Sequence, residues 1–170
     1  MHFSFPASTD KKNVFSAVAD FLNTEGFTVI NVDDSRPWGG FFVIEESQAA
    51  VFIKTFFPSL EIDSTSTNRV SPKILIVEPG KRLSWQYHHR RSEVWTVISD
   101  EVNICLSDTD DENIPATYSK NDVITIKRGA RHRLIGLNKW GIVAEIWQHT
   151  DAESPTDEND IVRLQDDYGR

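Results

Sequence analysis

The chain contains only one cysteine, Cys105, so its fold cannot depend on an internal disulfide. Basic residues are also scarce, since 18 Lys and Arg stand against 26 Asp and Glu and give a formal net charge of −8. A nucleic-acid binder needs a basic surface to attract phosphate groups, and we therefore expect no nucleic-acid partner. No run approaches the roughly 20 apolar residues of a membrane-spanning helix. These deficits predict a cytoplasmic protein that does not enter a membrane.

The 170 residues are nevertheless rich enough in apolar side chains, at 39%, to form one domain with a sizeable core. In segment 10–25 the apolar residues recur at spacings of three and four, which predicts an amphipathic helix. Gly26 then stands where a residue in the left-handed conformation would end that helix.

After residue 26 the pattern changes to short runs of β-branched and aromatic residues separated by turn residues, which predicts strands. Eight such runs follow: Phe27–Val32, Phe41–Ile44, Ala50–Phe56, Lys73–Val77, Glu93–Ile98, Val102–Leu106, Val123–Ile126 and Val143–Gln148. This pattern favours an antiparallel barrel or jelly roll behind one N-terminal helix. Ser59–Asn68 is expected to be a solvated loop, and Asp160–Leu164 is expected to pack the tail back on the barrel.

Four residues from two separate segments could form a metal site. Gln86 and His88 are two apart, so both face the same side of a strand, and Glu93 can return beside them after a turn over residues 89–92. His132 follows a glycine turn much later in the chain. Two imidazoles, a carboxylate and an amide oxygen suit a divalent transition metal and leave a position open for substrate or water.

Other interpretations of these residues stay open. A lone histidine in a strand is more often packed or exposed than bound to a metal, and His89 should point away from His88 if the strand is regular. Arg90 and Arg91 are expected in a solvated turn, and Trp95 is expected to be a core or rim aromatic rather than a platform for a sugar.

The spacing of these residues resembles the two-part cupin motif, in which a glycine precedes the ligand positions and a later Gly-x-x-His supplies the last one. Within the cupins the sequence is most similar to type II phosphomannose isomerase, a module often fused behind mannose-1-phosphate guanylyltransferase. The matching phrases are Arg36–Gly39, Pro79–Gln86, His88–Trp95, Gly129–Leu134 and Asp160–Arg170. They run in order over residues 36–170, so we expect a cupin domain there and an extension over residues 1–35 that packs on it.

The resemblance implies a mainly β protein, a double-stranded β-helix or jelly-roll cupin barrel, with a divalent metal held by Gln86, His88, Glu93 and His132. Zinc is the expected ion, and cobalt, manganese, nickel and iron are alternatives. The implied reaction interconverts mannose 6-phosphate and fructose 6-phosphate through a cis-enediolate, so a small sugar phosphate is the expected ligand. A homodimer is expected from fold analogy.

Such a reaction needs a base that moves a proton between C1 and C2, and it needs cations for the phosphate. Lys73 and Arg133 are the candidate catalytic residues, because a lysine desolvated near a metal can carry a proton and because Arg133 stands beside a ligand. Tyr168 and Arg170 are the candidate substrate-binding residues, since the family ends in this same phrase.

Some residues depart from the family pattern. Val94 stands where the family usually has His, and we expect this change to remove a polar group near the site. In the second motif Asn121, Lys127 and Gly136 replace the usual Gly, Pro and Asn. The alternatives are a non-catalytic cupin that binds a sugar or sugar phosphate and a non-haem Fe(II) oxygenase, for which two histidines and a carboxylate suffice. A glycine-rich nucleotide-binding loop is absent, so nucleotidyl transfer is not expected.

Overall fold

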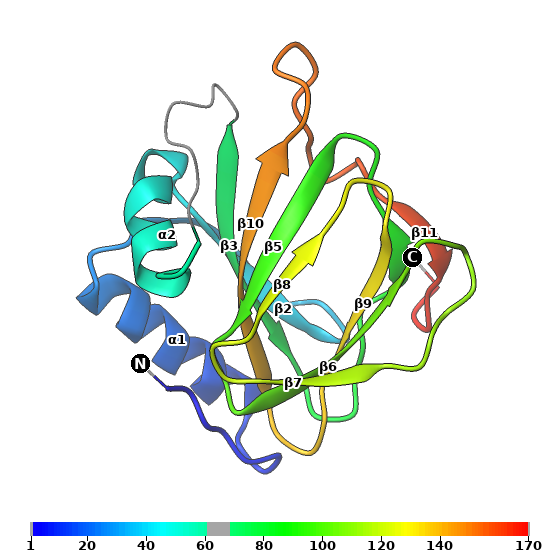
Figure 1. The fold of residues 1–170 in the computed structure, drawn as a ribbon. Coiled ribbons are helices and arrows are strands. Elements are labelled where there is room, and N and C mark those ends of the chain that lie inside the picture. Colours follow the sequence, from blue (N-terminus) through cyan, green and yellow to red (C-terminus); the bar gives the residue numbers. More distant parts are fainter. Residues whose placement is uncertain (1, 61–68, 170) are drawn as a thin grey trace.

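A computed structural model describes residues 2–60 and 69–169, which form two facing antiparallel sheets with helices against the larger one (Figure 1). The elements are α1 (Lys11–Thr24), β1 (Val29–Asp33), β2 (Gly39–Ile44), the short 3-10 helix η1 (Glu46–Gln48), α2 (Ala49–Phe56), β3 (Val70–Val77), β4 (Trp85–Tyr87), β5 (Arg91–Val97), β6 (Glu101–Ser107), β7 (Ala116–Ser119), β8 (Val123–Ile126), β9 (Arg131–Ile135), β10 (Gly141–His149) and β11 (Val162–Gln165). The larger sheet has the order β1-β2-β3-β10-β5-β8, and the smaller sheet has the order β11-β4-β9-β6-β7. The predicted jelly-roll barrel is confirmed.

The larger sheet is buried on both faces because its strands alternate between two apolar clusters. One cluster joins the sheet to the helices and contains Ile74, Ile76, Ile142, Ala144 and Ile146 from β3 and β10. The other fills the barrel between the two sheets and contains Leu75, Val77, Val97, Val143 and, from the smaller sheet, Val102, Ile104 and Leu134. The inner face of β3, β5 and β10 is therefore the wall on which a site inside the barrel must be built.

The predicted N-terminal helix is α1, and its apolar face packs on the outer face of the larger sheet. Val14, Val18 and Leu22 are buried in the cluster that joins the helices to β3 and β10. Gly26 has φ +79°, the left-handed conformation expected where the helix ends. The segment before residue 36 also supplies β1, which pairs with β2 at the edge of the larger sheet.

The strand predicted over Ala50–Phe56 is wrong, because this segment is helix α2. Its buried residues Phe52 and Phe56 lie four apart, as one face of a helix requires. Val51, which directly precedes Phe52, is exposed on another face of the helix. The run of β-branched and aromatic residues suggested a strand, but their spacing suits a helix that packs against β3 and α1. Phe56 contacts Phe21 of α1, and Phe52 and Phe56 both contact Phe27, which follows α1 in the chain.

The tail returns to the barrel as predicted, since β11 pairs with β4 and places Arg163 opposite Gln86. The predicted loop Ser59–Asn68 lies almost entirely outside the described residues. Among the helices of the described segments, none has the length and apolar character needed to cross a membrane.

Replacing Phe52 by Ala should destabilise the protein by about 3–5 kcal/mol, because it removes a buried ring from the contact between α2 and the rest of the core. Urea unfolding monitored by tryptophan fluorescence would measure the loss. Val51→Ala on the exposed side of the same helix is the matched control and should change the stability by about 0.5 kcal/mol or less. Equal effects of the two substitutions would contradict the described orientation of α2.

Candidate metal centre

Three of the predicted ligands converge where strands of both sheets meet. His88 follows β4 directly, Glu93 lies on β5 and His132 lies on β9. The backbone N–H of Gly129 donates to the carbonyl of His88 at 3.0 Å, which ties the two ligand-bearing segments together. Gly129 has φ +80°, a conformation that glycine adopts without strain, so the turn before His132 depends on it.

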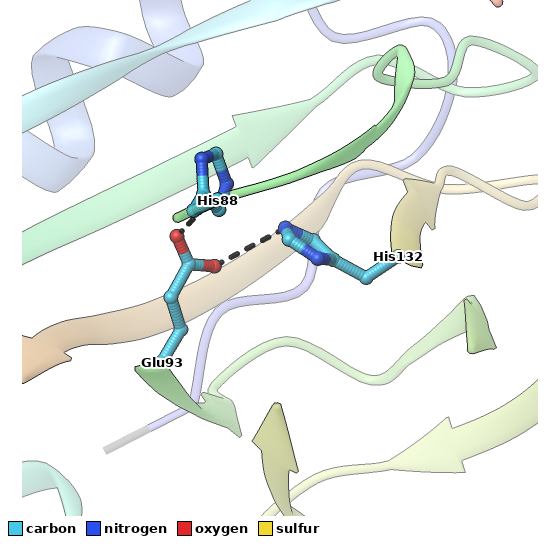
Figure 2. A group of neighbouring side chains, drawn as sticks. All are labelled: His88, Glu93 and His132. Atoms are coloured by element: carbon cyan, nitrogen blue, oxygen red, sulfur yellow. Dashed lines mark ion pairs between the residues drawn. The ribbon is translucent and has the colours of Figure 1, made fainter. Parts of the chain in front are cut away.

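The two imidazoles face the Glu93 carboxylate from two separate segments of the chain, as Figure 2 shows. His88 Nε2 lies 3.3 Å from Glu93 Oε1, and His132 Nε2 lies 3.3 Å from Glu93 Oε2. One ligand atom from each residue lies within 4.8 Å of the others, and all three side chains are buried. This is the donor set that a divalent transition metal takes in proteins.

Backbone carbonyls fix which nitrogen of each imidazole is available. His88 Nδ1 faces the carbonyl of Asp160, and His132 Nδ1 faces the carbonyl of Ala130 at 3.1 Å. A carbonyl oxygen can only accept, so each Nδ1 carries the proton and each Nε2 presents its lone pair to the cluster. Glu93 Oε2 and His132 Nε2 are buried and have no hydrogen-bond partner among the residues that the structure describes. Because a metal ion would satisfy both atoms, the residues fit the ion that the sequence implies.

Arg91 adds a positive charge to this cluster. Its Nε donates to Glu93 Oε1 at 2.7 Å and its Nη2 lies 3.1 Å from His88 Nε2. Burial lowers the pKa of His88 to about 3. Burial alone would raise the pKa of Glu93, but His88, Arg91 and His132 hold it well below its usual range. The groups are therefore a carboxylate and a neutral imidazole at neutral pH, the protonation states in which they bind metals.

A cavity of about 420 Å³ opens beside the cluster and is large enough for a small polar ligand. Its polar lining holds the cations Arg36, Lys73, Arg91 and Arg163, the carboxylates Glu93, Glu145 and Glu158, and the amide of Gln86. The cations outnumber the carboxylates, so the cavity suits a ligand that carries negative charge.

Lys73 and Glu145 lie on the same wall of this cavity as Glu93, on the adjacent strands β3 and β10 where they are register partners. Glu145 Oε1 accepts a hydrogen bond from Trp95 Nε1 at 2.9 Å. Burial, together with the charge of Glu93, raises the pKa of Glu145 to about 8. Burial also lowers the pKa of Lys73, which pairs with Glu158 and packs on the ring of Trp147.

The other predicted site residues are placed as follows. Gln86 lines the cavity as the cross-strand partner of His132, and its Oε1 accepts from the Ser84 hydroxyl at 2.6 Å. Arg133 lies on the opposite face of β9 from His132 and donates to the carboxylate of Glu112, so the structure does not bring it to the cavity. Tyr168 packs against the apolar cluster inside the barrel. Arg170 lies outside the described residues.

Two expectations from the sequence are corrected. Arg91 is not in a solvated turn, because β5 begins at this residue and its guanidinium is buried against Glu93 and the ring of Trp147. Its spacing of two from Glu93 on one strand was the signal that both face the same side. Val94 belongs to the cluster that packs on the helices, so its side chain points away from the site and removes nothing from it.

Asn121 has φ 72°, which asparagine tolerates where the family has glycine.

The sequence reasoning also missed Glu145, although a charged residue within the buried run of β10 was a visible signal. Trp147 and Glu158 could not be placed in the site from the sequence, because their roles depend on how the strands and the final loop meet.

Known proteins resemble this chain in both sequence and fold. A family model described as "Mannose-6-phosphate isomerase C-terminal" matches residues 26–166. The alginate biosynthesis protein AlgA of Pseudomonas putida is 36% identical over 96% of this chain and 28% of its own length. The xanthan biosynthesis protein XanB of Xanthomonas campestris is 30% identical over 79% of this chain and 23% of its own length. The chain thus spans less than a third of the length of these curated relatives.

Solved structures show the fold alone, since their sequences are distant. A mutant of the Bacillus subtilis oxalate decarboxylase OxdC superposes with a TM-score of 0.56 at 10% identity, over 79% of this chain and 30% of the other. CapF superposes with a TM-score of 0.52 at 20% identity, over 82% of this chain and 34% of the other.

Replacing His88 by Ala should abolish stoichiometric metal binding, because the cluster loses one of its three ligands. Metal content after loading and dialysis, measured by mass spectrometry, tests this. His89→Ala is the matched control, since His89 is the adjacent residue and is exposed. Retention of a full metal equivalent by the His88 variant would contradict the assignment.

Glu145 should make stability fall as the pH rises from about 4.5, its ordinary pKa, to about 8. Over that range the unfolded chain releases the proton that the folded chain keeps, so the folded state is progressively disfavoured. Glu145→Gln cannot titrate and should flatten this part of the profile in metal-free protein. Thermal unfolding of both proteins across this pH range is the measurement, and parallel profiles would refute the role of Glu145.

Proposed function

The chain belongs to the mannose-6-phosphate isomerase C-terminal family, and we propose that it interconverts mannose 6-phosphate and fructose 6-phosphate with a divalent metal, zinc first among the candidates. The observation that carries this proposal is the combination of the His88, Glu93 and His132 cluster with a cavity lined by cations. An isomerase of this kind needs both features, because charge develops on the sugar oxygens while the phosphate must be held.

The metal, when bound, would act as a Lewis acid that stabilises negative charge on the oxygens at C1 and C2. Glu93, His88 and His132 would hold it, with Gln86 at the edge of the same cavity. Arg91 lies against Glu93 and His88, where it favours the ionised carboxylate and the neutral imidazole.

Glu145 is the group that we assign to proton transfer. A carboxylate with a pKa near 8 can both accept and return a proton at neutral pH. In the forward direction, with the sugar in its open-chain form, the C2–H bond breaks, Glu145 takes the proton, and the electron pair forms the C1–C2 double bond of the enediolate as negative charge moves to the C1 oxygen. The hydroxyl proton on the C2 oxygen then passes to the C1 oxygen, which leaves the negative charge on the C2 oxygen. Glu145 returns its proton to C1 as the C2 carbonyl forms. Lys73, which lies beside two carboxylates, is better suited to binding an anion than to accepting a proton.

One observation favours a second candidate, a sugar-phosphate-binding protein without catalysis. The Arg91 guanidinium lies within hydrogen-bond distance of His88 Nε2, the atom that would bind the metal. If Arg91 stayed hydrogen-bonded to His88 Nε2 and paired with Glu93, these two ligands would not be available to a metal. The protein would then keep the anion-binding cavity but bind no metal.

A coupled assay for fructose 6-phosphate formation separates the two candidates. Protein stripped of metal and reloaded separately with zinc, cobalt, manganese, nickel and iron should turn over with at least one of them. His88→Ala should lose activity on the order of a hundredfold or more, because a metal ligand is gone.

His89→Ala is the control for this assay and should retain turnover, since His89 is exposed beside the site. Absence of turnover with every metal, in a protein that still binds mannose 6-phosphate, would leave the binding protein as the function.

A further inference from the structure

The buried ammonium of Lys73 has a counter-ion that lies mostly in water. The Lys73 side chain is 4% exposed, whereas its ion-pair partner Glu158 is 61% exposed. Two other cations of the cavity are paired differently, since Arg91 is held by the buried Glu93 and Arg36 by Asp33, which is 21% exposed. A buried cation needs a nearby anion, but an exposed carboxylate loses little when it returns to solvent. Of these three carboxylates, Glu158 is therefore the one that another anion can replace most easily.

The backbone around Glu158 is held in place while its side chain can turn away. Asp157 Oδ1 accepts from the backbone N–H groups of Asn159 and Asp160 at 2.8 and 3.1 Å. The Asp160 carboxylate in turn accepts from the backbone N–H groups of His89 and Arg90. Glu158 thus sits at the tip of a fixed turn, so its departure from Lys73 requires a change of rotamer rather than opening of the loop.

The walls of the cavity keep Lys73 in position without Glu158. The Lys73 Nζ lies 3.5 Å from the ring centroid of Trp147 and 5.0 Å from that of Phe41. Glu145 faces it from the neighbouring strand. If the Glu158 side chain turns away, the ammonium stays at the same point of the cavity and lacks one anionic partner. A phosphomonoester, with up to two negative charges and several acceptor oxygens, is a stronger partner than one carboxylate.

We propose that Lys73 anchors the phosphate of the ligand and that Glu158 is a resident counter-ion which the phosphate displaces. The identity of the ligand as a sugar phosphate rests on the proposed function. The consequence is selectivity, because only a ligand with its own anionic group can replace Glu158. A neutral sugar of the same shape would leave the pair intact and gain nothing from Lys73.

Titration calorimetry with inorganic phosphate, mannose 6-phosphate and mannose tests this exchange. Glu158→Gln removes the competing charge, so it should lower the Kd for both phosphates by about three- to tenfold and leave the Kd for mannose unchanged. Lys73→Met should abolish the advantage of mannose 6-phosphate over mannose. Each titration is run with the metal-loaded protein and again in EDTA, so that phosphate bound to a metal ion is counted separately.

Glu153→Gln is the matched control, because it removes the same charge from an exposed position of the same loop outside the cavity lining. An unchanged or higher Kd for phosphate in the Glu158 variant, or an effect equal to that of the Glu153 variant, would overturn the exchange. These binding constants do not depend on turnover. A protein without isomerase activity whose Glu158 variant binds phosphate more tightly would refute the proposed reaction and retain the phosphate site.

Discussion

The structure depends on how four ionisable side chains are kept inside the barrel. Lys73, Arg91, Glu93 and Glu145 are all buried on the inner face of three adjacent strands, where each charge would be costly alone. They are tolerated because each carboxyl group has a cationic neighbour, Lys73 for Glu145 and Arg91 for Glu93, and because Trp147 presents its ring to both cations. Burying these ionisable groups lowers the stability of the fold, so their presence is best explained by the chemistry of the cavity.

The outer face of the same strands supplies the stability that the inner face does not. Ile74 on β3 and Ala144 and Ile146 on β10 pack on the helices, one residue away in sequence from Lys73 and Glu145. Strict alternation makes this possible, since a shift of one residue in register would exchange the apolar and charged faces. The helices α1 and α2 thus serve the site indirectly, by burying the apolar face of the sheet that carries it.

Much of this could be predicted from the sequence, and the failures have physical reasons. Local strand and turn geometry predicted that Glu93 returns beside His88, whereas His132 was linked to them by the resemblance to the two-part cupin motif. Segment Ala50–Phe56 was misassigned because aromatic residues serve a helix face and a strand equally well, and only its packing decides between them. Arg91 was misplaced because β5 begins two residues earlier than the predicted strand. Val94 already lay inside the predicted strand next to Glu93, so its opposite orientation follows from strand alternation, which the comparison with the family pattern overlooked.

The contribution of the final loop was the part that sequence reasoning could least supply. Asp160 accepts from His88 Nδ1 with its carbonyl and from the backbone of residues 89 and 90 with its carboxylate. One residue of the C-terminal segment thereby sets both the orientation of a metal ligand and the path of the chain that follows it. Two residues earlier, Glu158 reaches the opposite wall of the cavity at Lys73. The pairing of β11 with β4 holds this segment in place, so the tail is a structural part of the site rather than a cover over it.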